Sequence, residues 1–380
     1  MILKIPGKTF LLGEYLAMKT GESILLTNSP LFVMQADFKF EDLQVTELQS
    51  KDLTLDQLNK MNELLNVEFE SEISFFKMDH DQHFCVRPQN SINQTELEHS
   101  LLHKNFQIFH PESPAGKFIF RHREFFKHIS IQWQDPYRNS GGLGASTAQY
   151  IGIIIFFYSQ VFKLTKSRSL ILDTELDQFE FGFTDFEHAK NNFKSTQHFH
   201  CNEKMRSLLL KNYQTDAWNG QGQKPSGQDF LVQLFGGQDW IWPDLSLIMV
   251  RTGFKLATHH HLQNLNHFEC ETLHKIYNLA IKAIEQRDIG ILIQSVNAYA
   301  DELENLGFVA DHTKEIIKQL KRSHYVQAIK GCGAMGADLC LILCYQVDEE
   351  KLINELNEKS YQVAFKTSDL YDSGVMIYEN

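Results

Sequence analysis

The sequence predicts an α+β protein of about two domains, which we place at residues 1–240 and 241–380. A chain of 380 residues is long for a single domain, since domains usually run to roughly 100 to 200 residues. Strand-like and helical patterns also recur in two blocks along the chain. Mixed elements in two blocks indicate two layered units.

The first block opens with strands and continues into helices. Four segments have short apolar, aromatic or alternating runs between turn residues, which is typical of strands: 2–5, 23–32, 69–87 and 116–134. In the last of these, KFIF and HISIQW are the clearest strand candidates. Three segments have helical spacing: 43–65, 170–193 and 203–213. The apolar run YIGIIIFFYSQVF is too short to cross about 30 Å of hydrocarbon, so we expect a buried core helix.

The second block has long amphipathic helices followed by strands. The helical patterns cover 262–287, 289–306 and 313–323. The strand patterns cover 245–252, 326–329, 340–345 and 362–366.

Composition limits the classes of partner. The chain has 36 Lys plus Arg against 48 Asp plus Glu, a formal net charge of −12. Nucleic acids and anionic membranes are bound through a surplus or a dense stripe of cations, so we expect neither as a partner. Six cysteines without dense spacing favour a reducing, cytoplasmic setting, and the first residues lack the pattern of a secretion signal.

Residues 139–148, NSGGLGASTA, run from a small-residue loop directly into the apolar helix. Glycines let backbone N–H groups approach a ligand, and a helix N-terminus presents unpaired N–H groups and a positive dipole end. A polyphosphate suits such a junction, and Ser146 and Thr147 add hydroxyls for Mg²⁺ or a phosphate oxygen. The spacing is neither GxxxxGK[ST] nor GxGxxG, so neither of those folds follows, and a plain turn remains the simpler interpretation.

Three other segments combine small residues with a charged group. Residues 5–15, IPGKTFLLGEY, place Lys8 after a Pro-Gly turn, and residues 225–229, PSGQD, place Asp229 in the first turn of a helix. Residues 330–338, KGCGAMGAD, form a small-residue loop between two strands. Their plainer interpretations are a solvated lysine, a helix cap and a bulged hairpin.

In this order and at these separations, the four segments resemble the GHMP small-molecule kinases, named for galactokinase, homoserine kinase, mevalonate kinase and phosphomevalonate kinase. The first motif, PGK followed by GEY, is met at Pro6, Gly7, Lys8, Gly13, Glu14 and Tyr15. The second, GLGSSAA, is met at Gly142, Leu143, Gly144, Ser146 and Ala148, with Ala145 and Thr147 departing from it. The acidic motif SGxD is met at Ser226, Gly227 and Asp229. The third, KxxGAGGGD, is met at Lys330, Gly333, Ala334, Gly336 and Asp338, with Met335 and Ala337 in place of glycines.

The resemblance covers residues 5–338, apart from 38–116, and implies the GHMP kinase fold. That fold has an N-terminal domain like domain 2 of ribosomal protein S5, a C-terminal ferredoxin-like domain and an active site between them. The resemblance also implies ATP and Mg²⁺ as cofactors, a small-molecule acceptor, and a monomer or homodimer.

The resemblance further implies a role for each motif residue. The catalytic pair is Lys8 and Asp229. The nucleotide-binding residues are Gly141, Gly142, Leu143, Gly144, Ala145, Ser146 and Thr147. The substrate-binding residues are Glu14, Tyr15, Ser226, Gly227, Gly333 and Ala334. Ser146 is expected to hold Mg²⁺, with Glu187 or Asp216 as the second metal-side carboxylate.

Details of the motifs favour the mevalonate-pathway branch of the family. Tyr15, the Gln221-Gly222 pair and Asp338 look like phosphomevalonate kinases, whereas the segment KPSG also looks like mevalonate kinases. A phosphorylated acceptor needs extra cations, for which Lys117, Arg121, Arg123 and Arg138 are candidates. The alternatives are a mevalonate kinase or another GHMP alcohol kinase, and a non-catalytic protein of this fold that senses a metabolite or nucleotide.

Overall fold

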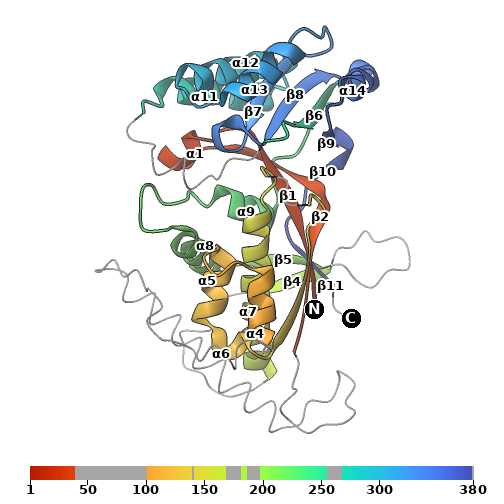
Figure 1. Cartoon of the computed structure of the whole chain (residues 1–380). Helices are drawn as coiled ribbons and strands as arrows, with labels where there is room; N and C mark the ends of the chain where they lie inside the picture. The colour runs from red at the N-terminus through yellow and green to blue at the C-terminus, as the bar shows by residue number, and fades with distance from the viewer. Residues whose placement is uncertain (39–100, 139–140, 168–180, 186–196, 255–267, 379–380) are drawn as a thin grey trace.

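The computed structural model describes residues 1–38, 101–138, 141–167, 181–185, 197–254 and 268–378. Within these residues the chain forms a larger sheet of seven strands and a smaller sheet of four, with helices packed on both (Figure 1). The mixture of helices and antiparallel sheets confirms the predicted α+β class.

The larger sheet is built around the antiparallel pair of β1 and β2. Its strands lie in the order β10-β2-β1-β11-β5-β4, and β3 pairs with β2. The bounds are β1 Ile2–Leu12, β2 Ile24–Phe38, β3 Ile129–Gln134, β4 Phe181–Asp185, β5 Gln197–Cys201, β10 Leu370–Tyr371 and β11 Met376–Tyr378. Because β10 and β11 belong to this sheet, residues 370–378 return from the second half of the chain to the first.

Helices cover one face of the larger sheet in two layers. In the inner layer, α7 (Ala145–Ser167) and α9 (Gln228–Phe235) pack on β1 and β2. The outer layer includes α5 (Pro114–Arg121), which packs on α7, and α8 (Glu203–Ala217), which packs on α5 and α9. The remaining short helices of this half are α1 Leu16–Lys19, α4 Leu101–Ile108 and α6 Arg123–Phe126.

The apolar run within α7 is buried, as the sequence predicts. Every residue from Tyr150 to Ser159 is inaccessible to solvent or nearly so. Helix α7 is therefore the core of the first half, and its N-terminus is fixed in space by that burial. Among the described helices, none combines the length and the apolar character needed to span a membrane.

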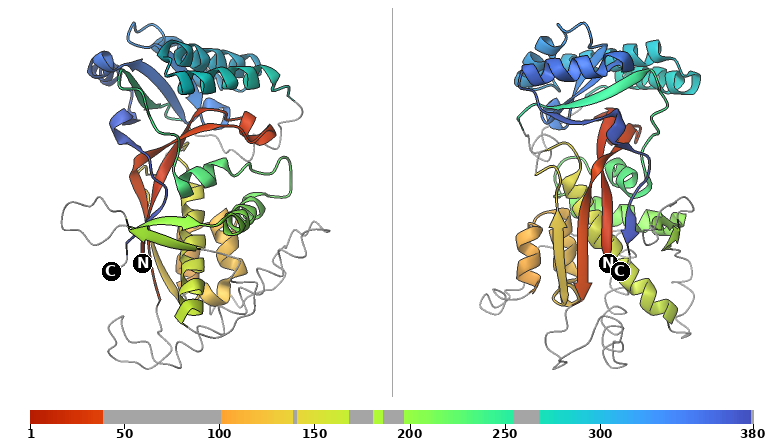
Figure 2. Two further views of the ribbon diagram at one scale, coloured as in Figure 1. Left: turned by 180° about the vertical axis from the view of Figure 1, so that it is seen from behind. Right: turned by 90° about the vertical axis from the view of Figure 1, so that its right-hand side faces the viewer.

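The smaller sheet forms the second half with the remaining helices. Its antiparallel strands lie in the order β7-β8-β6-β9, with bounds β6 Leu245–Arg251, β7 Ala328–Cys332, β8 Leu339–Tyr345 and β9 Val363–Lys366. The helices are α11 Glu271–Gln286, α12 Ile289–Asn305, α13 Asp311–Leu320 and α14 Glu349–Glu358. Helices α12 and α13 pack on β7, and α14 packs on β8. Figure 2 shows that one end of the β1–β2 pair reaches this half.

Two predicted elements are wrong in type, and one begins later than predicted. The KFIF segment lies in α5, not in a strand, because Ser113 caps the helix by accepting the N–H of Gly116 and Pro114 occupies its first turn. Residues 181–185 form a strand paired with β5, inside a segment predicted to be helical. The helix predicted from residue 262 begins, in the described residues, at Glu271.

The strands predicted over 2–5, 23–32, 245–252, 340–345 and 362–366, the HISIQW strand, and the helices predicted over 203–213, 289–306 and 313–323 are confirmed. The strand predicted over 326–329 is found at Ala328–Cys332, and α6 occupies 123–126 within a segment predicted as strand. The predicted elements over 43–65 and 69–87 lie outside the described residues. The division into domains at residue 240, and their likeness to ribosomal S5 and ferredoxin, stay predictions.

Candidate active site

Lys8 lies where strand β1 meets the glycine-rich loop. The backbone N–H of Lys8 donates to the carbonyl oxygen of Leu143 at 3.1 Å, which attaches the first motif to the second. The Lys8 side chain is half-buried, and its Nζ lies 4.7 Å from the centroid of the Phe10 ring. The backbone of Lys8 therefore lies beside the loop, and its ammonium group lies near the Phe10 ring.

The glycine-rich loop has a backbone that only glycine adopts readily. Gly142 and Gly144 have φ angles of +86° and +83°. A Cβ on Gly144 would lie 2.7 Å from Oε1 of Gln233. Gln233 itself donates from Nε2 to the carbonyl oxygen of Pro6 at 2.6 Å, so this buried side chain supports both motifs.

Helix α7 begins directly after this loop, at Ala145. The backbone N–H of Ala148 bonds to the oxygen of Gly144 at 2.9 Å, so the preceding N–H groups of the first turn have no carbonyl within the helix. The Ser146 side chain is exposed at this end. Free N–H groups, the positive end of the helix dipole and a hydroxyl together suit a phosphate group.

Asp229 lies in the first turn of α9 and faces α7 and α8. Its Oδ2 accepts the hydroxyl of Thr147 at 2.9 Å and the hydroxyl of Tyr213 at 3.2 Å. Ser226 accepts the N–H of Gln228 and so helps to start the helix, after Gly227 at the N-cap. In the described part of the chain, no ion pair joins Asp229 to Lys8.

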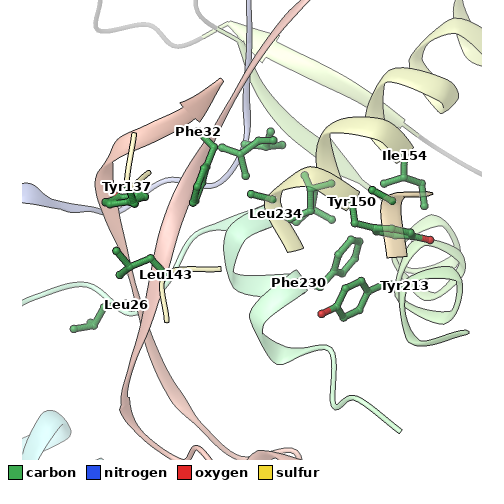
Figure 3. Close-up of a cluster of buried hydrophobic side chains, with 14 of the residues drawn as sticks. Leu26, Phe32, Tyr137, Leu143, Tyr150, Ile154, Tyr213, Phe230 and Leu234 are labelled. Atoms are coloured by element: carbon green, nitrogen blue, oxygen red, sulfur yellow. The ribbon is translucent and has the colours of Figure 1, made fainter. Parts of the chain in front are cut away.

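Tyr213 is a site residue that sequence reasoning missed. It lies outside every motif and is only 6% exposed. Burial, together with the nearby charge of Asp229, raises the pKa of Tyr213 well above its ordinary value, so the phenol stays protonated and keeps its donor. Its ring stacks on Phe230, with Tyr150 edge-on beside it (Figure 3). The position of the hydroxyl is thus fixed by core packing.

The third motif is joined to the first by a buried ion pair. The Lys330 side chain is fully buried and its Nζ pairs with Oε1 of Glu14, whose side chain is 7% exposed. Burial alone would lower the pKa of Lys330, but Cys332 and Glu14 outweigh it and hold the pKa above its usual value. Tyr15 accepts the N–H of Met335 at 3.2 Å and stacks on Phe308. Glu14 and Tyr15, predicted to bind substrate, therefore face the protein interior and anchor the third loop.

The third loop also contacts the second. The side chain of Asp338 lies so close to Gly141, Gly142 and Gly333 that a Cβ on any of them would collide with it. Ala334 is buried in this loop. All four motifs are thus linked by contacts and form one continuous structure.

The departures from the family pattern preserve the shape of this structure. Ala145 begins α7, and Ala337 has an ordinary φ of −82°. Met335 takes the left-handed conformation, with φ 54° and ψ 25°, at a position where the pattern has glycine. The loop therefore keeps a glycine-like backbone at the cost of local strain.

Comparison with known proteins finds similarity at the level of the fold. No protein-family model and no curated protein sequence matches the chain. Among solved structures, Methanococcus jannaschii mevalonate kinase is similar, with a TM-score of 0.53 and 15% identity over 100% of this chain and 98% of that chain. Streptococcus pneumoniae phosphomevalonate kinase, solved with phosphomevalonate and AMPPNP, has a TM-score of 0.52 and 14% identity over 96% and 99%.

The chain has the fold of the GHMP kinases. Lactococcus lactis galactokinase, solved with galactose, is also similar, with a TM-score of 0.52 and 10% identity over 98% of this chain and 94% of that chain. The resemblance found in the motifs is confirmed in the fold. Since the similar proteins have different acceptors, the fold leaves the choice of acceptor open.

Within this fold, the carboxylate of Asp216 is bound by neighbouring side chains. Arg121 donates to both carboxylate oxygens of Asp216 at 2.8 Å, and Tyr150 donates to Oδ2 at 2.9 Å. Lys117 binds the carbonyl oxygens of Asp216 and Trp218 at the end of α8. Because Asp216 is 4% exposed and bonded at both oxygens, its predicted role at a metal loses support. Glu187, the other candidate, lies outside the described residues.

Mg²⁺ fits this GHMP site through Ser146. The described residues contain no group of three or more His, Cys, Asp or Glu side chains that could hold a metal ion. Magnesium in nucleotide sites takes most of its ligands from phosphates and water, so it needs few protein oxygens. The exposed hydroxyl of Ser146, at the helix end that suits phosphate, meets that need.

Proposed function

We propose that this chain is an ATP-dependent small-molecule kinase, which transfers the γ-phosphate of ATP to a mevalonate-type acceptor. The observation that carries the proposal is the hydrogen bond of 2.9 Å between Thr147 and Asp229. It places the only acidic group of the SGxD motif against the helix that begins at the phosphate-binding loop. The GHMP fold over the full chain supports the same conclusion.

The residues divide the work of phosphoryl transfer between them. Backbone N–H groups from Gly141 to Thr147 would hold the phosphates, and Ser146 would hold a Mg²⁺ ion, which would supply neutralisation of their charge. Lys8, beside the loop, stabilises the transferring group. Oδ1 of Asp229 accepts no hydrogen bond from the described residues, since both hydroxyls bond to Oδ2. It is therefore the oxygen that would face the acceptor.

Two acceptor chemistries have separate support. The motif details favour phosphomevalonate, which we take as the first candidate. The second candidate is an alcohol such as mevalonate, and a specific observation favours it. Two of the cations suggested for a phosphorylated acceptor, Arg121 and Lys117, are already bound to Asp216 and to the end of α8.

ADP release from purified protein with ATP and Mg²⁺ tests the proposal. Mevalonate, phosphomevalonate and galactose are added separately, and we expect acceptor-dependent ADP with a mevalonate-type acceptor. Lys8→Met should abolish that signal. The matched control is Lys4→Met on the same strand, where Lys4 packs over the ring of Tyr378 away from the loop. Nucleotide binding without any acceptor-dependent ADP would instead support a non-catalytic sensor.

A further inference from the structure

Thr147 occupies a position where the GHMP pattern has alanine, and the structure gives its hydroxyl a partner. The side chain is 4% exposed, in the first turn of α7. Its Oγ1 lies 2.9 Å from Oδ2 of Asp229 and 3.2 Å from the hydroxyl oxygen of Tyr213. The hydroxyl is therefore turned toward the acidic group and away from the solvent-facing side where Ser146 lies.

The number of hydrogen-bond donors on Thr147 and Tyr213 determines how the Asp229 carboxylate is oriented. An ionised carboxylate only accepts hydrogen bonds, and each hydroxyl carries one proton. Since burial and the charge of Asp229 keep Tyr213 protonated, both hydroxyls have a proton to give. Two donors on Oδ2 fix the rotation of the carboxylate and leave Oδ1 available. Hydrogen bonds to a charged group are stronger than those between neutral groups, so two of them select one orientation of the carboxylate.

The same contact links the two reacting partners. Thr147 follows Ser146 in the first turn of α7, the turn that we assign to the phosphates. Asp229 is on α9, and no ion pair to Lys8 holds its carboxylate in place. The Thr147 hydroxyl is thus the direct bond between the helix that binds nucleotide and the carboxylate that faces the acceptor.

We propose that Thr147 is a positioning residue, whose hydroxyl orients Asp229 so that Oδ1 faces the acceptor oxygen. Tyr213 supports the same oxygen from α8. This role rests on the proposed kinase function. It differs from nucleotide binding, the role that the motif implies for Thr147, because the hydroxyl acts on the carboxylate and only the backbone serves the phosphate.

Kinetics of three variants test the proposal. Thr147→Val, which keeps the side-chain shape, should lower kcat by ~10-fold to 10²-fold while the KM for ATP stays within about twofold, since misplaced reacting groups cost rate. Thr147→Ser should restore most of kcat. Ser159→Ala is the matched control, because it removes a buried hydroxyl whose one bond among the described residues is to Ile155 on the same helix, and it should leave kcat unchanged. An unchanged kcat in Thr147→Val, or a rise in KM for ATP in its place, would overturn the proposal.

Crystal structures separate this proposal from the proposed function. In Thr147→Val we expect the Asp229 carboxylate to rotate, while in Thr147→Ser it keeps the wild-type orientation. An unrotated Asp229 in Thr147→Val overturns the positioning role whether or not the enzyme is active. A wild-type protein that gives no acceptor-dependent ADP overturns the kinase function, and with it the role of Thr147 in transfer.

Discussion

Under the proposed function, Asp229 is the residue on which the acceptor chemistry would depend. An alcohol loses its proton with difficulty at neutral pH, so a base contributes typically ~10²-fold to 10⁴-fold. A phosphomonoester, with a second pKa near 6, is already largely ionised and needs orientation more than proton removal. The orientation is what Thr147 and Tyr213 supply to Asp229.

Asp229→Asn should therefore separate the two acceptor classes. We expect it to abolish transfer to an alcohol and to leave measurable transfer to a phosphate acceptor, because the amide keeps the shape but cannot take a proton. Rates of ADP formation with mevalonate and phosphomevalonate measure the difference. An equal collapse with both acceptors would contradict this distinction.

Residue type explains which site residues the sequence could predict. Lys8, Ser146 and Asp229 lie in recognisable motifs. Tyr213 and Gln233 do not, since one is an aromatic residue in a helix and the other an amide, and each becomes part of the site only through folding. Gln233 meets Pro6 across 227 positions of sequence. Asp216 is the opposite case, because its carboxylate suggests a metal ligand in the sequence, whereas in the structure it is bound by Arg121 and Tyr150.

At the scale of elements, α14 is held by a carboxylate at its first position. Glu349 accepts the hydroxyl of Ser246 on β6 at 2.6 Å and pairs with Lys366 on β9 at 2.8 Å. Burial by itself raises the pKa of Glu349, but the hydrogen bonds from Lys366 and Ser246 outweigh it and lower the pKa below its ordinary value of 4.5. The ionised form is therefore the one that fastens α14 to the sheet.

A pH dependence follows from this lowered pKa. A depressed carboxyl pKa stabilises the fold above the unfolded value near 4.5, and that stability is lost as the pH falls through the folded pKa. Glu349→Gln should lower the free energy of unfolding at pH 7 by about 1 to 3 kcal/mol, with a smaller loss at acid pH. Denaturant titrations at pH 7 and pH 4 measure this. Glu358→Gln, at an exposed position of α14, is the control, and an equal effect from it would contradict the prediction.

The α7 helix is predicted correctly and the KFIF segment wrongly, and the difference has a physical cause. The length and continuity of the apolar run in α7 predict a core helix. The aromatic residues of KFIF predict a strand, but the cap at Ser113 and packing against α7 stabilise a helix there. In the KFIF segment, helix capping and packing thus outweigh the strand preference of the aromatic residues.

At the scale of the whole molecule, the Glu14–Lys330 pair joins the two sheets. Glu14 lies two residues after the end of β1 of the larger sheet, and Lys330 lies in β7 of the smaller one. A buried charge that loses its partner costs about 3 to 5 kcal/mol, whereas an apolar pair of similar volume is often tolerated. Substitution of the two residues therefore tests how much this ion pair contributes to the stability of the contact between the two sheets.

Lys330→Met should lower the melting temperature strongly, because it leaves Glu14 buried and unpaired. Glu14→Leu combined with Lys330→Met should recover part of the loss. Thermal unfolding of the single and double variants measures both. A double variant that loses the sum of the two single losses would show that the pair is not coupled.

The sequence predicts two blocks of mixed helices and strands, but it does not predict the return of the chain to the first sheet. Strands β10 and β11 have two and three residues, too few for a periodic pattern. Their place is set by pairing with β2 and β1. Long-range pairing of such short segments is visible only in the folded chain.

The crystal structure of this protein with AMPPNP, Mg²⁺ and a mevalonate-type acceptor tests the central claim most directly. We predict the phosphates on the N–H groups of Gly141 to Thr147, with the acceptor oxygen between the γ-phosphorus and Oδ1 of Asp229. A nucleotide bound away from that loop, or an acceptor that does not face Asp229, would contradict the assignment of this site to phosphoryl transfer.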